Sequence, residues 1–499
     1  MDNIVTRLAP SPTSRFCHLG NLRTLLFNYL FAKNQGGKFL VRLEDTDADR
    51  YTPEFLDHFK KTMDWLNIVP DASYWNPDPK IGSFIQSERD YSKYINILLN
   101  KGLAYYAFDT KEDLDVLRSK GLKYDATTRN SMNNSLVNPS TDALLQSGIP
   151  YVIRFKVTPD LDITFKDEIL GDITINSNQI DDKVLLKSNG IGSYHLCNVC
   201  DDHDMGVTHV MRGNEWVNST PLHIMLYQAL DWEVPTFCHL PLIMNPDGKG
   251  KLAKRTANRY GIPISPIGYY DDNNVYHKGW KDLGYDPDSF LNALALIGWS
   301  PGDDKELMSM DEMIDLFSLD GIGKSGARFD MDKAKWINSQ HLKKVDSKYL
   351  LDYVNLKDDR YSNDKVLEIV DLAKLRSDFK HEMQSVVDLF YDDVKIDNLK
   401  LVNDDFIKWV SDETYGFIVT CKDCDFSDKV KIKQFIYDSC QNLGIKMGKV
   451  MPGLRLALVG GVPGPDLITT LSILGKSESR KRVANVMMKL MEEKLKELG

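Results

Sequence analysis

Two short loops of this sequence carry side chains that could bind a polyphosphate. The first, RLAPSPTSRFCHLGN at residues 7–21, places His18 two residues before Gly20. An imidazole can donate a hydrogen bond to a phosphate oxygen, glycine lets a ligand approach the backbone, and the free amides at a helix N-terminus bind anions. The arrangement predicts a site for a nucleoside triphosphate. A glycine-containing loop with an internally satisfied histidine has the same pattern and is the alternative.

The second loop, GKGKLAKR at residues 248–255, follows the apolar run LPLIM. Several cations at one point can stabilise the charge of a polyphosphate during displacement. The segment lacks the spacing of a Walker loop, and no GxGxxG follows the first apolar segment of the chain. Taken alone, the loop could also be a solvated basic turn. Its cations are Lys249, Lys251, Lys254 and Arg255.

The residues around the first loop predict the elements that hold it. IVTRL at residues 4–8 predicts a short buried strand, which Pro10 and Pro12 end. Apolar residues then recur at helical spacing up to the two glycines at 36–37, and FLVRLED predicts a second buried strand. A strand–helix–strand unit of this size gives a parallel pair. Ligands bind beyond the carboxyl ends of such strands, which is where the first loop lies.

The composition is that of a globular chain. Its 499 residues suffice for several domains, and 42% hydrophobic with 27% charged residues is an ordinary mix. No apolar run reaches the length of a membrane span and the N-terminus lacks a secretory pattern, so we expect a cytoplasmic protein without membrane contact. The net charge of −10 argues against a protein that simply coats nucleic acid, but it permits a local basic surface.

The seven cysteines are scattered, which is typical of a reducing compartment. Cys197 and Cys200 form one CxxC, and Cys421 and Cys424 form another. Zinc sites favour pairs separated by about a dozen residues, and these two pairs lie much further apart. We therefore predict no metal site within the protein itself.

Together, RLAPSPT…HLGN and GKLAKR resemble the paired HIGH and KMSKS signatures of class I aminoacyl-tRNA synthetases. Further segments are similar, in order, to the bacterial-type glutamyl-tRNA synthetase family. The resemblance runs from residue 4 to MGKVMPGLRLALVGGVPGP, almost the whole chain, and so many segments in the same order are specific. These segments are LVRLEDTDADRY, YVIRFKV, VLLKSNG, YHLCNVCDDHDMGVTHVMRGNEWVNSTP and LPLIMNPDGKGKLAKR.

The resemblance implies an enzyme that uses ATP and Mg²⁺ to activate glutamate as glutamyl-adenylate, and then transfers it to the 3′ end of tRNA(Glu). The substrate carboxylate is itself the nucleophile, so catalysis consists mainly of positioning and charge stabilisation. By the family's pattern His18, Lys251 and Lys254 are catalytic, and they bind ATP together with Gly20 and Glu215. The resemblance also implies that tRNA binding completes the site.

Glutamate carries two carboxylates and one ammonium group, so its pocket needs both cations and an anion. The family's pattern assigns Glu44 to the amine and Arg212 to the α-carboxylate. It assigns Arg7, with Tyr194 and Asn198, to the side-chain carboxylate, because a planar guanidinium can bind both oxygens. The complete set of matching positions is Arg7, Ser11, Glu44, Tyr194, Asn198 and Arg212. Glu44 could instead pair with Arg42 or Arg50 on an exposed strand end.

Three departures from the family's pattern concern the two phosphate loops. The link TSRFC has Ser14 in place of a glycine and one extra residue, Asn21 replaces the second histidine of HIGH, and Ala253 replaces the serine of KMSKS. These changes could slow activation, but they leave His18 and both signature lysines in place, so we expect an active enzyme. A non-catalytic or altered-function tRNA-binding paralogue is the alternative.

The expected fold is an α/β nucleotide-binding, Rossmann-like catalytic domain with an insertion, followed by a mostly α-helical anticodon-binding region. Residues 1–100 and 190–250 form the catalytic domain, 101–189 the insertion that binds the tRNA acceptor end, 251–330 the KMSKS loop and a stem-contact region, and 331–499 the anticodon-binding region. We expect a monomer. Glutaminyl relatives have a β-rich C-terminal half, short relatives that modify a tRNA base lack an anticodon domain, and a small nucleotidyltransferase leaves residues 285–499 unexplained.

One residue of the C-terminal region bears on the choice of tRNA. In VDLAKLRSDFK, Arg376 falls where selective relatives have an arginine that faces the third anticodon letter, which is C in glutamate tRNA and G in glutamine tRNA. A guanidinium offers only donors, and the pairing edge of cytosine offers acceptors where guanine presents donors. The resemblance therefore implies that Arg376 favours glutamate tRNA. An exposed helix residue without such a role is the alternative.

Overall fold

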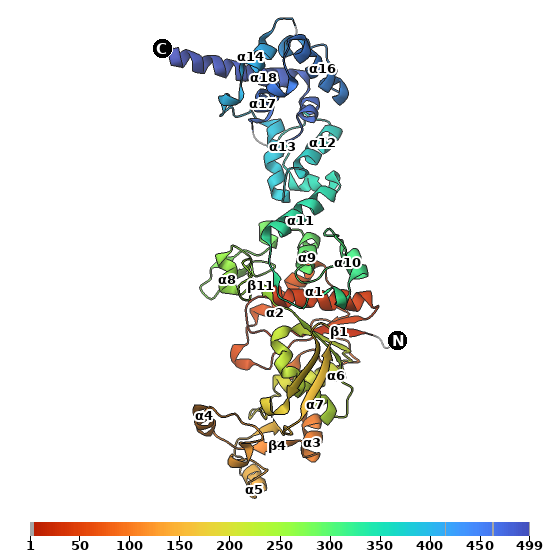
Figure 1. Ribbon diagram of the computed structural model, residues 1–499, viewed down its shortest axis with the longest axis vertical. Coiled ribbons are helices and arrows are strands. Elements are labelled where there is room, and N and C mark those ends of the chain that lie inside the picture. The colour runs from red at the N-terminus through yellow and green to blue at the C-terminus, as the bar shows by residue number, and fades with distance from the viewer. Residues whose placement is uncertain (1–3, 415, 462–463, 499) are drawn as a thin grey trace. The chain divides into compact units, whose positions relative to one another are not determined.

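The computed structural model describes residues 4–414, 416–461 and 464–498 (Figure 1). The chain divides into two compact units, Met1–Ala334 and Lys335–Gly499. Within the described residues, every helix is too short or too polar to cross a lipid bilayer.

The first strand–helix–strand unit forms as the sequence predicts. Strand β1 (Val5–Leu8) ends before the two prolines, α1 (Leu19–Asn34) follows, and β2 (Lys38–Val41) pairs with β1 in parallel, with Val5 opposite Lys38. Helix α1 ends because Gly36 adopts a φ of +63°, which side chains disfavour. Strand β3 (Ala72–Ser73) extends this sheet next to β2.

A second sheet, in the order β7–β6–β10–β9, lies beside the first. Strands β9 (His209–Gly213) and β10 (Thr236–Leu240) are parallel and are joined through α7 (Thr220–Ala229). The amide of Thr208 donates a 3.0 Å hydrogen bond to the Val5 carbonyl, which places β9 beside β1. Asn28 of α1 donates to the Met211 carbonyl at 3.1 Å, so the helix is tied to both sheets.

The insertion contributes one hairpin to this second sheet. Strands β6 (Asp162–Asp167) and β7 (Gly171–Asn176) are antiparallel, and β6 pairs with β10 where Phe237 lies opposite Asp167. Asp167 also accepts a 3.0 Å hydrogen bond from the backbone amide of His239. Because the Asp167 carboxylate is buried and accepts several hydrogen bonds, it stabilises the junction between β6 and β10. Strand β6 lies within the range 101–189 that the sequence predicts as the insertion.

The rest of the insertion has its own small antiparallel sheet. Strands β4, β5 and β8 form it in the order β4–β5–β8. The buried carboxylate of Asp182 accepts a 2.6 Å hydrogen bond from the Tyr105 hydroxyl and pairs with Arg129 at 3.1 Å. These contacts hold the loops that contain Asp182 and Arg129 against the sheet. The elements from the start of the insertion onward are β4 (Ala104–Ala107), α4 (Lys111–Ser119), α5 (Thr141–Gln146), β5 (Val152–Phe155) and β8 (Val184–Leu186).

The segment that follows β10 holds the cationic loop. Strand β11 (Ile243–Met244) precedes the loop, and α8 (Lys254–Arg259) begins at its second signature lysine. A short hairpin, β12 (Tyr269–Tyr270) and β13 (Tyr276–His277), follows this helix. The remaining elements of this unit are α2 (Glu54–Leu66), α3 (Ser92–Asn100), α6 (Tyr194–Asp204), α9 (Pro287–Ala295), α10 (Met310–Leu316) and β14 (Ala327–Arg328).

The described part of the second unit is helical and contains no strand, as expected for the C-terminal region. Its core is built around Trp409, whose indole N–H donates to the Ser439 hydroxyl at 2.9 Å. A Cβ on Gly453 would lie 2.4 Å from the Phe406 ring, so this glycine lets α14 and α17 approach each other. The helices are α11 (Met331–Lys344), which spans the division, α12 (Asn363–Lys374), α13 (Met383–Tyr391), α14 (Asp404–Ser411), α15 (Phe417–Thr420), α16 (Lys429–Asn442), α17 (Met447–Val459) and α18 (Leu467–Leu498).

Candidate active site

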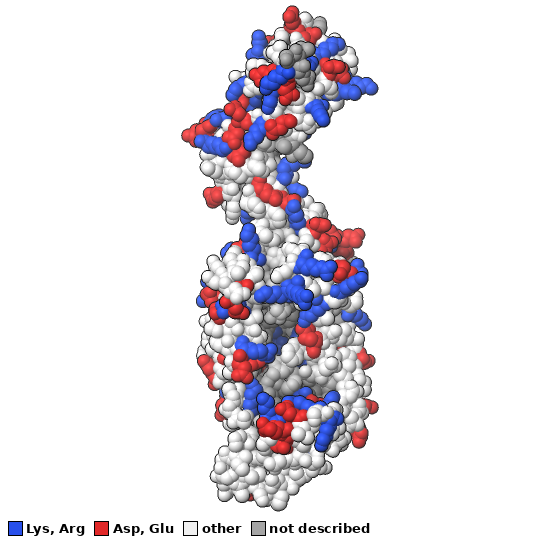
Figure 2. Space-filling view, turned by 90° about the vertical axis from the view of Figure 1, so that its left-hand side faces the viewer, with Lys and Arg blue, Asp and Glu red and all other residues white. Residues whose placement is uncertain are grey.

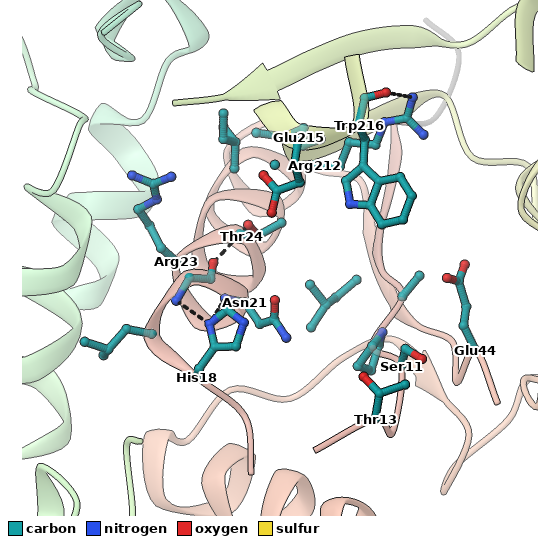
Figure 3. A pocket seen from close by; sticks show the side chains of 18 of the residues that line it. Ser11, Thr13, His18, Asn21, Arg23, Thr24, Glu44, Arg212, Glu215 and Trp216 are labelled. Carbon is teal, nitrogen blue, oxygen red and sulfur yellow. Dashed lines mark hydrogen bonds between the residues drawn. The ribbon is translucent and has the colours of Figure 1, made fainter. Parts of the chain in front are cut away.

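A cavity of about 520 Å³ lies at the carboxyl ends of β1, β9 and β10, where the sequence places the ligand. Figure 3 shows His18 and Asn21 at one end of it and Ser11 with Glu44 at the other. All six predicted glutamate-binding residues line this cavity, and so do four of the five predicted ATP-binding residues. The fifth, Lys254, lines a neighbouring cavity of about 720 Å³, and Arg376 belongs to the second unit.

His18 immediately precedes α1 and caps it. Its Nδ1 accepts hydrogen bonds from the amides of Gly20 at 3.0 Å and Asn21 at 3.4 Å. Burial and the nearby Lys251 lower the pKa of His18, so the ring is neutral at pH 7. Because Nδ1 accepts, the proton lies on Nε2, from which it can be donated to a ligand. The two helix amides that the sequence offers to an anion are therefore occupied by His18 itself.

Gly20 has a role that the loop pattern alone does not indicate. A Cβ at this position would lie 2.9 Å from Cε1 and 3.1 Å from Nδ1 of His18. Glycine therefore leaves room for the imidazole to fold back over the first turn of α1, in addition to opening the backbone to a ligand.

The first signature lysine forms an ion pair within the cavity. Lys251 Nζ lies 3.1 Å from Glu215 Oε1, and each side chain is 47% exposed. An ion pair of this exposure is weak and exchanges readily with a charged ligand. Lys251 is therefore available to a polyphosphate that displaces it from Glu215.

Lys254 lies over a pair of aromatic rings and, together with His18 and Lys251, lines the neighbouring cavity. Its Nζ is 5.6 Å from the centre of the Phe16 ring and 5.4 Å from that of Tyr269, and these rings stack at 4.1 Å. Phe16 belongs to TSRFC, the link whose sequence differs from the family's pattern. Tyr269 belongs to the hairpin β12–β13. Ala253 offers α8 no side-chain cap, and its own amide donates to the Thr256 hydroxyl at 2.9 Å.

The part of the cavity lined by the six predicted glutamate-binding residues is called the glutamate end here, and two cations at this end, Arg7 and Arg42, belong to a buried network. Arg7 donates two hydrogen bonds to Asp202, at 3.0 and 3.1 Å. Arg42 donates to Asp202 at 2.8 Å and to Glu44 at 3.0 Å, and Asn198 donates to the same Glu44 oxygen at 3.0 Å. Glu44 thus pairs with Arg42 as the alternative proposes, but it is only 8% exposed and lines the cavity, so the expected exposed strand end is wrong.

Arg212 is a buried cation of this cavity without a carboxylate partner among the described residues, and so is Arg23, which donates to the carbonyls of Ile297 and Pro241. All five N–H groups of Arg212 contact neutral acceptors, and burial lowers its pKa. Two contacts are long and lie on the cavity side, 3.4 Å to the Tyr194 hydroxyl and 3.3 Å to the Trp216 carbonyl. The others are His239 Nε2 at 3.1 Å, His223 Nδ1 at 3.2 Å and the Thr220 hydroxyl at 2.8 Å.

Sequence reasoning did not find Asp202, Arg42, or the histidines behind Arg212. A signal existed for the first of these, because Tyr194, Asn198 and Asp202 recur every four residues and share one face of α6. The remaining groups depend on contacts between distant parts of the chain. Local spacing does not encode such contacts.

The cysteines take no part in the site. All seven are buried free thiols, and no group of three or more potential metal ligands occurs within residues 4–414, 416–461 and 464–498. Burial raises the pKa of Cys17, which immediately precedes His18, to about 12, so its thiol stays protonated at neutral pH.

Comparisons with known proteins agree with this architecture. Residues 3–336 match the family described as tRNA synthetases class I (E and Q), catalytic domain, and residues 340–487 match an anticodon binding domain. The fold and the site thus define a class I aminoacyl-tRNA synthetase. The chain is similar over almost its whole length to glutamate–tRNA ligases, one branch of that class.

Two glutamate–tRNA ligases illustrate the similarity in sequence. The one from Amoebophilus asiaticus is 38% identical over 498 residues, and the one from Flavobacterium psychrophilum 39% over 497, each covering 96% of this chain and 97% of the relative. The crystal structure of a glutamate tRNA ligase from Elizabethkingia meningosepticum in complex with its amino acid has a TM-score of 0.85 at 38% identity, covering 98% of this chain and 99% of the other. The chain belongs to the glutamate–tRNA ligase family, which confirms the predicted fold class, class of enzyme and activity.

Proposed function

We propose that the cavity binds glutamate and ATP side by side, joins them as glutamyl-adenylate, and presents this intermediate to the 3′ end of tRNA(Glu). The observation that supports this most strongly is Arg212. A buried guanidinium without a direct counter-ion is unfavourable unless a ligand carries a negative charge to it. Glu44 lies in the same cavity, so a molecule with both a carboxylate and an ammonium group matches its charges.

The glutamate end has separate groups for each part of the substrate. Arg212 is proposed to bind the α-carboxylate by exchanging its long contacts to Tyr194 and Trp216. Glu44 is proposed to bind the ammonium group through Oε2, since Arg42 and Asn198 both occupy Oε1. For the side-chain carboxylate we propose Arg7, Tyr194 and Asn198, with Ser11 beside them. Asp202 holds Arg7 by two of its donors and leaves the others for the ligand.

The ATP end supplies donors and charge to the phosphates. His18 would donate from Nε2, and Lys251 and Lys254 would stabilise the departing pyrophosphate. Mg²⁺ is held in such sites by one or two carboxylates together with substrate phosphates, and Glu215, a half-exposed carboxylate in the cavity, fits that donor set. When bound with ATP, the ion neutralises part of the phosphate charge. The chain's own contribution is to orient the α-phosphorus toward the glutamate carboxylate.

The other regions are proposed to bind tRNA as the family's pattern assigns them. Residues 101–189 would hold the acceptor end, 251–330 the stem and 331–499 the anticodon. Figure 2 shows lysine and arginine side chains gathered around a hollow in one face of the larger unit, which suits a polyanionic partner in spite of the net negative charge. We propose a monomer that acts in the cytoplasm, where its tRNA is used.

The proposal predicts glutamate-dependent ATP–pyrophosphate exchange that requires tRNA. In the free protein Lys251 is paired with Glu215 and Lys254 lies over Phe16 and Tyr269, so both lysines have to exchange these contacts for the phosphates. Binding of tRNA would supply the closure, as in induced fit. The measurement is exchange with and without tRNA(Glu), with glutamine in place of glutamate as the control. A well-folded protein that shows no exchange with any cellular tRNA would instead be the non-catalytic paralogue.

A second prediction concerns the choice of tRNA. Arg376 is exposed just beyond α12, and its side chain makes no hydrogen bond or ion pair with the described residues. Burial and Arg376 together lower the pKa of Arg455, so the two guanidiniums lie near each other and present donors. The pairing edge of cytosine accepts from such donors at O2 and N3, where guanine presents its own N1–H and N2–H donors, and a buried mismatch of this kind is strongly rejected.

We therefore expect the protein to charge tRNA(Glu) in preference to tRNA(Gln), and Arg376→Gln to reduce that preference. Charging of both purified tRNAs by the two proteins is the measurement. Arg360→Gln, an exposed arginine of the same unit that is paired with Asp358, is the matched control and should keep the preference. Equal charging of both tRNAs by the unaltered protein, or an unchanged preference in Arg376→Gln, would contradict the prediction.

A further inference from the structure

A run of buried polar side chains, beginning with two imidazoles, lies directly behind Arg212 and takes no part in the chemistry described above. Arg212 Nε contacts His239 Nε2 at 3.1 Å, and His239 Nδ1 lies 2.6 Å from Asp167. On the other side, Arg212 contacts His223 Nδ1 at 3.2 Å, and His223 Nε2 lies 3.2 Å from His195 Nδ1. His223, His239 and Asp167 are each no more than 1% exposed.

The positions of the protons in this run follow from Arg212. A guanidinium can only donate, so the nitrogens that face it on His239 and His223 must be acceptors. The proton of His239 therefore lies on Nδ1 and is donated to Asp167, and that of His223 lies on Nε2 and is donated to His195. Burial and the positive charge of Arg212 lower the pKa of His223, and burial lowers the pKa of His195 to about 4. The imidazoles are neutral at pH 7.

Arg7 and Arg212 differ in how their positive charges are balanced by nearby carboxylates. Arg7 forms a bidentate ion pair with Asp202 at 3.0 Å. The carboxylate behind Arg212, that of Asp167, is separated from it by the whole imidazole of His239. Coulomb attraction falls with distance, so the positive charge of Arg212 is neutralised less by its carboxylate than that of Arg7. Arg212 can therefore attract a negatively charged ligand more strongly.

The front and the back of the guanidinium are also held differently. Tyr194 and Trp216 line the cavity and contact Arg212 at 3.4 and 3.3 Å, which is long for a hydrogen bond. The contacts behind it are shorter, and His223, His239 and Thr220 do not line the cavity. An incoming carboxylate can therefore replace the front contacts while the back contacts keep the guanidinium plane fixed.

We propose that His223 and His239 are positioning residues for substrate binding, which orient Arg212 as neutral acceptors and so leave its positive charge for the substrate carboxylate. The inference rests on the proposed function of the cavity. A carboxylate in place of either imidazole would orient Arg212 equally well but would neutralise it. An apolar side chain would preserve the charge but would release the guanidinium from its orientation.

The test compares three replacements of His223 in ATP–pyrophosphate exchange with tRNA(Glu) present. His223→Leu removes the acceptor, His223→Asn keeps an oxygen near the position of Nδ1, and His223→Asp adds a charge there. Loss of a hydrogen bond to a charged group predicts an increase in the KM for glutamate of about 10- to 100-fold in His223→Leu. His223→Asn should restore the KM to within about threefold, and the KM for ATP should stay the same in both.

The aspartate variant separates positioning by a neutral acceptor from simple structural support. We expect His223→Asp to raise the KM for glutamate at least as much as His223→Leu does, although its ion pair with Arg212 should preserve or raise the melting temperature. His239→Gln and His239→Leu provide the same comparison on the other side of the guanidinium. His203→Leu, at an exposed histidine stacked on Trp232 outside the cavity, controls for the loss of an imidazole and should leave both KM values unchanged.

The outcomes distinguish this inference from the proposed function. If the unaltered protein shows no glutamate-dependent exchange, the proposed function and this inference both fail. If it is active and the leucine variants keep the glutamate KM within about twofold, or His223→Asp behaves like His223→Asn, the inference alone is overturned. Should His223→Leu not fold, the Asn–Asp comparison still decides the matter.

Discussion

Replacing Lys254 by alanine should slow glutamate-dependent ATP–pyrophosphate exchange about 10²- to 10³-fold, the usual cost of removing a donor that acts in the transition state. The KM for glutamate should change little, because Lys254 does not line the cavity that holds the six predicted glutamate-binding residues. In the resting protein its ammonium group lies over Phe16 and Tyr269, and it must leave these rings to reach the phosphates. Pre-steady-state formation of the adenylate is the direct measurement.

Lys249→Ala is the matched control for this experiment. Lys249 is an exposed lysine of the same loop, outside the family's signature, and its side chain forms no hydrogen bond or ion pair with the described residues. If both alanine variants lose activity equally, the loop acts as a general basic patch, and the specific role of Lys254 would be wrong.

Asp202→Asn should destabilise the larger unit by about 3–5 kcal/mol, the typical result when one partner of a buried ion pair is removed. Asp202 is 1% exposed, and it accepts hydrogen bonds from Arg7 at 3.0 Å and Arg42 at 2.8 Å. Without its charge these two buried guanidiniums lose their shared counter-ion. Because the chain has two compact units, the measurement is the unfolding transition of the larger unit, followed by tryptophan fluorescence in urea.

The same substitution should change how stability depends on pH. Burial opposes the ionisation of Asp202, but Arg7 and Arg42 outweigh it and hold its pKa below the ordinary value. A carboxyl with a depressed pKa stabilises the fold above its unfolded pKa of about 3.9 and loses that effect as the pH falls through the folded pKa. Asp202→Asn should therefore lack this part of the acid transition. Asp57→Asn, which breaks an exposed helix pair with Lys61, should leave both measurements unchanged.

The local elements around the first loop were predictable because their signals are local. Prolines end β1, apolar residues at helical spacing form α1, and the glycines at 36–37 end it. The positions of the glutamate-binding residues followed from the family resemblance, and the cavity brings them together. Their assigned roles stay predictions, as do the boundaries of the tRNA-binding regions.

The contacts that sequence reasoning missed depend on side-chain conformation or on distant partners. Whether the amides at the start of α1 are free depends on the rotamer of His18, which folds back to accept from them. The pairing of β6 with β10 rests on one residue pair, Asp167 with Phe237, and no periodicity in the sequence predicts this pairing. Arg42 and Glu44 share one side of an extended segment, and only the fold shows that this side is buried against α6.

The stack of Phe16 on Tyr269 has a consequence for how this enzyme can be recombined with its relatives. The two rings come from opposite ends of the larger unit's sequence, yet each forms half of the surface on which Lys254 lies. Exchanging the TSRFC link alone for a relative's shorter link would take the Phe16 ring from Tyr269, which would keep its stack on His277, and exchanging the hairpin alone would take the Tyr269 ring from Phe16. The link and the hairpin therefore constitute one module, and a functional chimera has to inherit both from the same parent.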